Sequence, residues 1–165
     1  MKKITAAVVL TALSIGIFST PLPAAGKGSC SGVIRLIQKY DDRDGVEAVN
    51  LGGFLLGIAK IAASGEEGSE WLDYIDRMAV FTAEDASEET KAEFTAELMA
   101  VLGEYEKAVE MKDGADDMSI WMKMKDEETI KEMVMVSNSE SAIIFLGGNI
   151  PMSEMADVVT NASQQ

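Results

Sequence analysis

The sequence predicts an α+β fold in which an antiparallel sheet carries helices on one face, giving two layers. Helical periodicity dominates the first half of the chain, whereas alternation of apolar and polar residues dominates the second half from Tyr105 onward. Short polar turns separate the alternating segments, as in a meander of antiparallel hairpins. The chain has 165 residues and shows no repeat or linker, so we expect a single domain over residues 27–165.

Three segments of the first half have helical character. Residues 31–40 place apolar side chains at three- and four-residue spacing, and an aspartate-rich turn ending in Gly45 follows them. Residues 54–63 are densely apolar, and their length favours a buried helix over a strand. Asp85 with Glu88 is typical of a capping box and predicts a third helix that ends near residue 103.

Six segments are predicted as strands, and a short helix is expected over residues 151–159. The predicted strands are 46–51, 78–82, 105–112, 118–125, 130–136 and 142–146. The last of these is apolar on both faces, so we expect it in the centre of the sheet. We interpret the glycine pair at 147–148 that follows it as a bend.

Residues 1–26 have the character of a secretory signal peptide. Lys2 and Lys3 supply the positive start, residues 4–18 form an uncharged and largely apolar run, and small residues precede a cut before Lys27. The apolar run is shorter than the roughly 20 residues that a membrane-spanning helix needs. We therefore expect export to the periplasm or the extracellular medium, with no membrane span after signal removal.

Cys30 is the single cysteine, so the chain cannot form an internal disulfide. Small residues precede it, as in a lipoprotein signal, but Lys27 stands where an aliphatic residue is usual. A free thiol, acylation and pairing with another chain all stay open, and so does the oligomeric state.

The chain is strongly acidic, with 14 Lys+Arg against 28 Asp+Glu and a formal net charge of −14. Such a chain cannot neutralise many backbone phosphates, which argues against nucleic-acid binding. It contains no histidine, which excludes Ser-His and Cys-His nucleophile pairs and all histidine metal sites. We therefore expect no catalytic residue, no cofactor and no metal ligand.

Carboxylates are numerous enough to build a glycosidase-like pair, but none stands in an apolar context that would raise its pKa. Asp41, Asp42 and Asp44 suggest a calcium loop. With Gly45 as the central glycine of an EF-hand, however, the twelfth position falls on Leu51, and the template fails. A helix-ending turn explains these aspartates better.

Methionine is frequent, with 11 residues. Met122 with Met124, and Met133 with Met135, form two spaced pairs on neighbouring predicted strands. Thioethers on one sheet face suit Cu(I), which is a soft ion. The same alternation fits core packing, where methionine fills irregular space, and we adopt that interpretation.

Trp121, together with Lys123 and Lys125, is the candidate partner surface. These three residues alternate with the methionines of the predicted strand 118–125. If the methionines face the helices, Trp121 lies on the opposite sheet face as an aromatic anchor for a partner.

Several segments resemble a bacterial family of domains of unknown function, number 4252. The resemblance is carried by the run from Gln38 to Val46, by residues 105–123 and by residues 132–146, and it covers about Ser31 to Val159. It implies a small exported protein of Gram-negative bacteria with no assigned activity, in some cases encoded near envelope-stress sigma factors. The family offers no catalytic residues to carry over.

We therefore expect an exported, non-enzymatic binding or interaction module with an unknown protein or small ligand in the cell envelope, acting in envelope homeostasis or stress signalling. The first alternative is a carboxylate-based hydrolase or carbohydrate-active protein. The second is a methionine-based copper or calcium binder.

Overall fold

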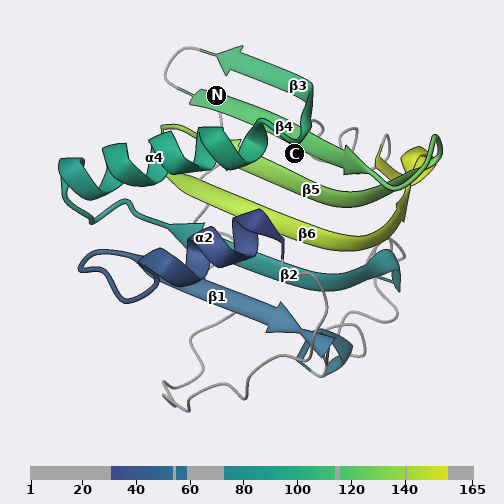
Figure 1. Cartoon of the computed structure of the whole chain (residues 1–165), viewed down its shortest axis with the longest axis horizontal. Helices are drawn as coiled ribbons and strands as arrows, with labels where there is room; N and C mark the ends of the chain where they lie inside the picture. The colour runs from purple at the N-terminus through teal and green to yellow at the C-terminus, as the bar shows by residue number, and fades with distance from the viewer. Residues whose placement is uncertain (1–30, 54, 59–72, 114–115, 140, 156–165) are drawn as a thin grey trace.

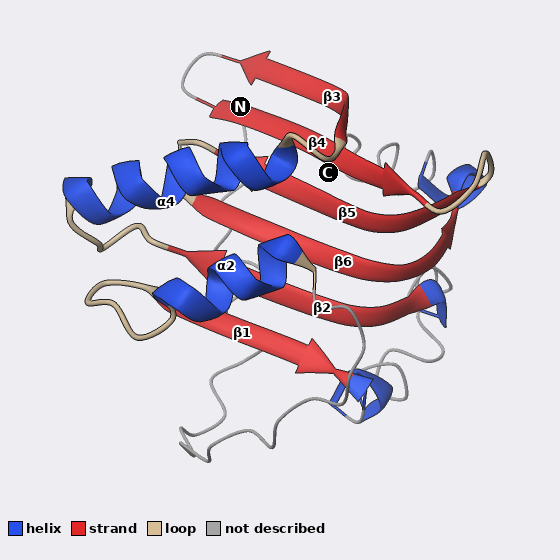
Figure 2. Ribbon diagram, in the orientation of Figure 1, coloured by secondary structure: helices blue, strands red, loops and turns tan. Residues whose placement is uncertain are grey.

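The computed structural model describes residues 31–53, 55–58, 73–113, 116–139 and 141–155. These residues form a six-stranded antiparallel sheet, and two helices lie across one of its faces (Figure 1, Figure 2). The elements are α2 (Gly32–Tyr40), β1 (Glu47–Gly52), β2 (Ile75–Thr82), α4 (Glu88–Leu102), β3 (Glu106–Asp113), β4 (Asp116–Met124), β5 (Thr129–Ser137) and β6 (Ala142–Pro151). The predicted α+β class, with an antiparallel sheet, is confirmed.

The strands lie in the order β1-β2-β6-β5-β4-β3. The last four strands along the chain are neighbours in that order, which is the predicted meander. Strand β2 pairs with the free side of β6, so β6 lies inside the sheet as its two apolar faces predict. Strands β1 and β3 are the two outer strands among the described residues.

Strand β6 is longer than predicted, because Gly147 and Gly148 lie within it and do not end it. Register shifts in both neighbouring strands fall opposite this pair, between Ile75 and Arg77 in β2 and between Ile130 and Glu132 in β5. The glycines interpreted as a bend therefore lie at an irregularity within the strand. A Cβ added at Gly148 would lie 2.0 Å from the backbone oxygen of Tyr74. Glycine is therefore needed there so that the chain leading into β2 can approach β6 closely.

Serine residues cap both helices. The Ser31 hydroxyl accepts a hydrogen bond from the backbone N–H of Val33 at the start of α2. At the start of α4 the Ser87 hydroxyl accepts from the backbone N–H of Thr90 at 3.1 Å. The predicted start of this helix at Asp85 was therefore wrong by two residues, because the serine two positions later satisfies the first-turn amide.

The turn after α2 behaves as its sequence predicts. Gly45 has a φ of +76°, a conformation that L side chains rarely adopt. A Cβ at Gly45 would also lie 2.2 Å from the backbone oxygen of Asp85. The glycine thus lets the turn between α2 and β1 rest against the turn between β2 and α4.

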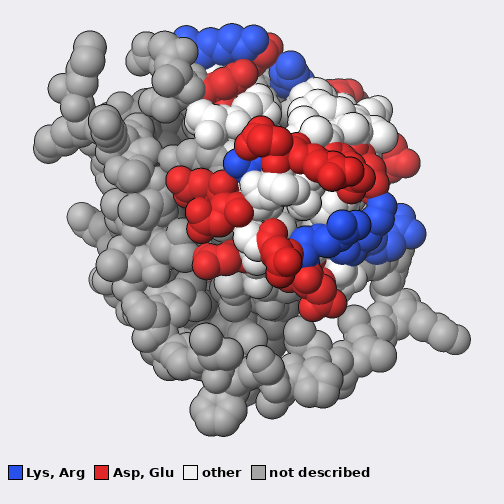
Figure 3. All heavy atoms as spheres, turned by 90° about the vertical axis from the view of Figure 1, so that its left-hand side faces the viewer, with Lys and Arg blue, Asp and Glu red and all other residues white. Residues whose placement is uncertain are grey.

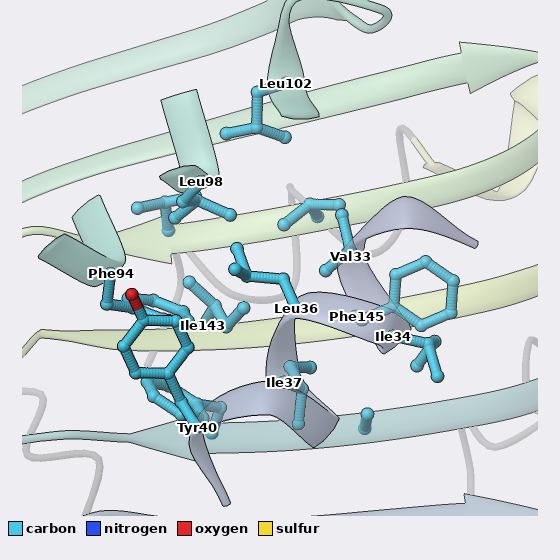
Figure 4. Close-up of a cluster of buried hydrophobic side chains, with 14 of the residues drawn as sticks. Val33, Ile34, Leu36, Ile37, Tyr40, Phe94, Leu98, Leu102, Ile143 and Phe145 are labelled. Carbon is cyan, nitrogen blue, oxygen red and sulfur yellow. The ribbon is translucent and has the colours of Figure 1, made fainter. Parts of the chain in front are cut away.

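The helices and the sheet enclose a core of aliphatic and aromatic side chains (Figure 4). The ring of Phe94 on α4 stacks on Phe81 of β2, with centroids 4.1 Å apart, and meets the edge of Tyr40 at 5.3 Å. Such ring pairs add to the free energy of burial. None of the residues in this helix-side core is a methionine.

The opposite sheet face forms a second apolar cluster, which contains the strand methionines. Met122 on β4 and Met133 on β5 are directly opposed in register and buried. These methionines therefore do not face the helices, and the condition under which Trp121 would lie on the opposite face is not met. The strands alternate, and Trp121 and Val134 belong to the helix side, so the methionines between them must point to the far side.

Two predicted helices are described only in part. Residues 55–58 of the predicted helix 54–63 are helical, and so are residues 152–155 of the predicted helix 151–159. The remainder of both segments lies outside the described residues, as do the predicted signal peptide and Cys30. No helix in the described part of the chain has the length and hydropathy to cross a membrane.

Candidate functional site

Trp121 lies on the helix side of the sheet and not on the opposite face. Its indole is partly buried against the helix-side core, and its Nε1 donates a hydrogen bond to the Ser119 hydroxyl at 3.0 Å. The Lys107 ammonium lies 5.0 Å from the ring centroid, in cation–π range. The ring is thus held by neighbours from its own chain, and Trp121 does not lie on the sheet face opposite the helices, where the anchor was expected.

The two lysines of the predicted partner surface point to different surroundings. Lys123 Nζ lies 2.8 Å from Glu104 Oε2, and this hydrogen bond holds the pKa of the Glu104 carboxyl below its ordinary value. Lys125, just beyond β4, donates to Asn149 Oδ1 at 2.7 Å. The structure therefore brings Trp121 and Lys123 to one face and places Lys125 at the strand end; their role in binding a partner stays a prediction.

A polar cluster that sequence reasoning missed joins the start of α2 to the sheet. Tyr105 OH donates a short hydrogen bond to Glu132 Oε2, and the Ser31 hydroxyl donates to the same oxygen at 3.1 Å. Burial, reinforced by the bond to Glu132, raises the pKa of Tyr105 above its ordinary value. Ser31 and Glu132 are about a hundred positions apart, so no local pattern could reveal their contact.

The hydrogen bonds of this cluster connect the start of α2 to the sheet. The tyrosine stays protonated and donates, while the carboxylate accepts from two hydroxyls. Across the described residues, no buried side-chain nitrogen or oxygen is left without a hydrogen-bond partner. These hydrogen bonds therefore hold the N-cap of α2 against Glu132 of β5.

A small cavity lies under α4, where Phe94 and Leu98 meet the β5–β6 turn. Its volume is about 30 Å³, and Ser137, Asn138 and Ser141 supply its polar atoms. That volume suits about one water molecule. None of the described residues that line it carries a carboxylate.

Asp41, Asp42 and Asp44 are exposed in the turn after α2. Within the part of the chain that the structure describes, no three His, Cys, Asp or Glu side chains are grouped so that they could hold a metal ion. Figure 3 shows acidic side chains bordering uncharged ones at the end of the molecule that lies on the left in Figure 1.

Exposed apolar side chains lie where β1 ends and β2 begins, at the end of the sheet away from the acidic turn. Leu55 and Ile58, on the helical segment after β1, are 50% and 49% exposed, whereas Leu56 between them is buried in the far-side cluster. Tyr74, just before β2, is also exposed. Gly52 of β1 pairs with Arg77 of β2, so both segments leave the sheet at the same end.

We call Leu55, Ile58 and Tyr74 the strand-end surface. Residues three apart share one side of a helix, so Leu55 and Ile58 point the same way. The expectation of a buried helix was wrong for these two residues. The density of apolar side chains in this segment was the signal, but a segment that is apolar all round does not show which of its sides is covered.

A family model for a domain of unknown function (DUF4252) matches residues 40–158 of this chain. The match spans most of the sequence, and the chain belongs to this family. No curated protein and no solved structure matches the chain.

Proposed function

We propose that this member of the domain-of-unknown-function family is an exported, non-enzymatic binding module of the cell envelope. Its recognition site is the strand-end surface of Leu55, Ile58 and Tyr74. A role in envelope homeostasis or stress signalling would use this surface to engage a protein partner.

The exposure of Leu55 and Ile58 carries the proposal. Both side chains are about half exposed to solvent, whereas Leu56 on the same segment is buried. Covering an apolar side chain completely contributes about 1.5–3 kcal/mol, and about half of that gain is left for a partner at each position. Exposed apolar groups that are gathered at one place are typical of interaction sites.

The carboxylates with shifted pKa values support a non-enzymatic role. Hydrogen bonds from lysines lower the pKa of Glu97, Glu104 and Glu110, and a hydrogen bond with Thr129 lowers that of Asp126. A general acid of a glycosidase needs the opposite shift, towards neutral pH. These four carboxylates are therefore suited to ion pairs and turns and not to proton donation.

Export is tested by the mass of the protein recovered from cells that express the full chain. We expect the envelope or medium fraction to contain a chain that begins at Lys27. A further mass increase at Cys30 would identify acylation. An unprocessed chain in the cytoplasm would contradict the proposal.

Recognition is tested by capture from envelope extract with three forms of the protein. We expect Leu55→Glu with Ile58→Glu to lose a partner that the unchanged protein recovers in stoichiometric amount. Met99→Glu is the matched control, because Met99 is 40% exposed on α4, away from the strand-end surface. Equal recovery by all three forms would contradict the proposed site.

A further inference from the structure

The two outer strands of the sheet differ in how they resist pairing with another strand. Strand β3 carries Lys107, Glu110 and Lys112, with Glu110 bonded to both lysines at 3.3 and 3.2 Å. Its register with β4 also shifts between Lys107 and Val109. Charges and a bulge are the usual protection of an outer strand, so β3 is guarded against further pairing.

Strand β1 has neither protection. It pairs with β2 without a register shift, and Glu47 is its single charged residue. Val49, at its middle, is 38% exposed. In the described part of the chain, the other edge of β1 has no strand beside it. Its outward backbone groups are therefore a template for an additional strand.

We infer that β1 pairs with β1 of a second copy of this chain, antiparallel about Val49. Side chains alternate between faces, so a two-fold axis through Val49 keeps the helices of both copies on the same side. It places Val49 opposite Val49 of the second copy, Ala48 opposite Asn50, and Glu47 opposite Leu51. No two like charges are directly opposed in this register.

The far-side apolar cluster supports the same register. Register pairing carries one apolar row across the whole sheet, through Val49, Val80, Ile144, Met135, Ile120 and Val109. The row ends in solvent at Val49 on the β1 edge. Pairing two β1 strands covers this end with its own equivalent and joins the two rows into one. A second copy thus supplies the apolar side chain that the position needs.

The chain carries a net charge of −14, but its acidic turn at residues 41–44 lies away from the centre of the proposed pairing. The acidic turn at residues 41–44 precedes β1, so antiparallel pairing sends the two turns to opposite ends of the interface. Glu47, the first residue of β1, is opposite Leu51, so at about 3.3 Å per residue it lies roughly 13 Å from its counterpart, and the acidic turn lies beyond that strand end. Ionic screening acts over about 8 Å at physiological salt, so repulsion between the turns is small.

Sedimentation equilibrium of the purified protein measures this self-association. We expect a monomer–dimer equilibrium, and we expect Val49→Lys to raise its dissociation constant at least about tenfold, because it opposes two ammonium groups. Met111→Lys is the matched control, since Met111 on β3 faces the same side and is 42% exposed. A monomer throughout, or equal weakening by both substitutions, overturns the inference.

A disulfide reports the register without relying on charge. With Cys30→Ser as background, Val49→Cys is expected to form a covalent dimer on mild oxidation, because the Cα atoms of directly opposed antiparallel residues lie about 4.5–5.5 Å apart, a distance that a disulfide spans. Met111→Cys in the same background is expected to stay monomeric. Equal cross-linking at both positions contradicts pairing through β1. The proposed strand-end surface is unaffected by either result, because its test changes Leu55 and Ile58.

Discussion

Single polar side chains fasten the ends of elements in this domain. Tyr105 and Ser31 both donate to Glu132, and all three groups lie where α2 meets the sheet. A hydrogen bond to a charged group contributes about 1.5–3 kcal/mol when it is satisfied. The cluster therefore contributes to stability at one place, and no sequence pattern predicts it.

We expect Tyr105→Phe to lower the free energy of unfolding by about 1.5–3 kcal/mol, because Glu132 loses one of its two hydroxyl donors. Urea denaturation followed by circular dichroism measures this change. Tyr74→Phe is the control, since Tyr74 is exposed and its hydroxyl is not in the cluster. Equal losses from both substitutions would show that the cluster contributes nothing specific.

The ion pair between α2 and α4 gives a pH dependence. Lys39 Nζ donates to both carboxylate oxygens of Glu97, at 2.6 and 2.7 Å, and holds the pKa of Glu97 below its ordinary value of 4.5. A lowered pKa in the folded state stabilises the protein above the unfolded value, and this gain is lost as the pH falls through the folded value.

We therefore expect Glu97→Gln to be less stable than the unchanged protein at neutral pH and to lose less stability on acidification below pH 4.5. Chemical denaturation at a series of pH values gives the two profiles. Both groups are exposed, so the difference is small and shrinks in high salt. Parallel profiles at low salt would contradict the assignment.

At the scale of elements, the ring of Phe94 joins α4 both to the sheet and to α2. Phe94 lies between Phe81 of the sheet and Tyr40 of α2, and it is buried. We expect Phe94→Ala to lower the free energy of unfolding by about 3–5 kcal/mol, because it removes both ring contacts and leaves a cavity. Thermal or urea unfolding measures this loss, and Met99→Ala on the exposed side of α4 should change stability by less than about 0.5 kcal/mol.

The two turns that meet at Gly45 give a second test at this scale. Gly45→Ala combines strain at positive φ with a Cβ that meets the Asp85 backbone. Gly53 also has positive φ, but a Cβ there would have no neighbouring atom within 4 Å. We expect Gly45→Ala to destabilise clearly more than Gly53→Ala in urea unfolding. Equal effects would show that the turns do not pack closely.

For the whole molecule, the sequence was sufficient to predict the class and order of elements. The alternation in residues 118–125 and the polar turns are local signals, and they led to the meander. Which face of the sheet the helices cover is not local, because both faces of this sheet are apolar and their rows differ mainly in methionine content. The expected position of Trp121 on the face opposite the helices was wrong for that reason.

The strand-end surface could not be predicted from the sequence for a related reason. The side chains of this segment are all aliphatic, so residue type does not separate them. Leu56 is nevertheless buried, whereas Leu55 and Ile58 are exposed. Their difference depends on where the far-side cluster lies relative to the end of β1. Similarly, the sequence predicts both β1 and β3 as strands but does not show that they are the outer ones. Their outer position follows from the order of strands in the sheet.

Recognition through the strand-end surface is tested most directly by photo-cross-linking in living cells. A photoreactive residue would replace Leu55 in one strain and Met99 in a second, since both side chains are comparably exposed. The account predicts a discrete covalent adduct of the exported protein from position 55 and none from position 99. The same pattern from both positions, or no adduct from position 55, would contradict it.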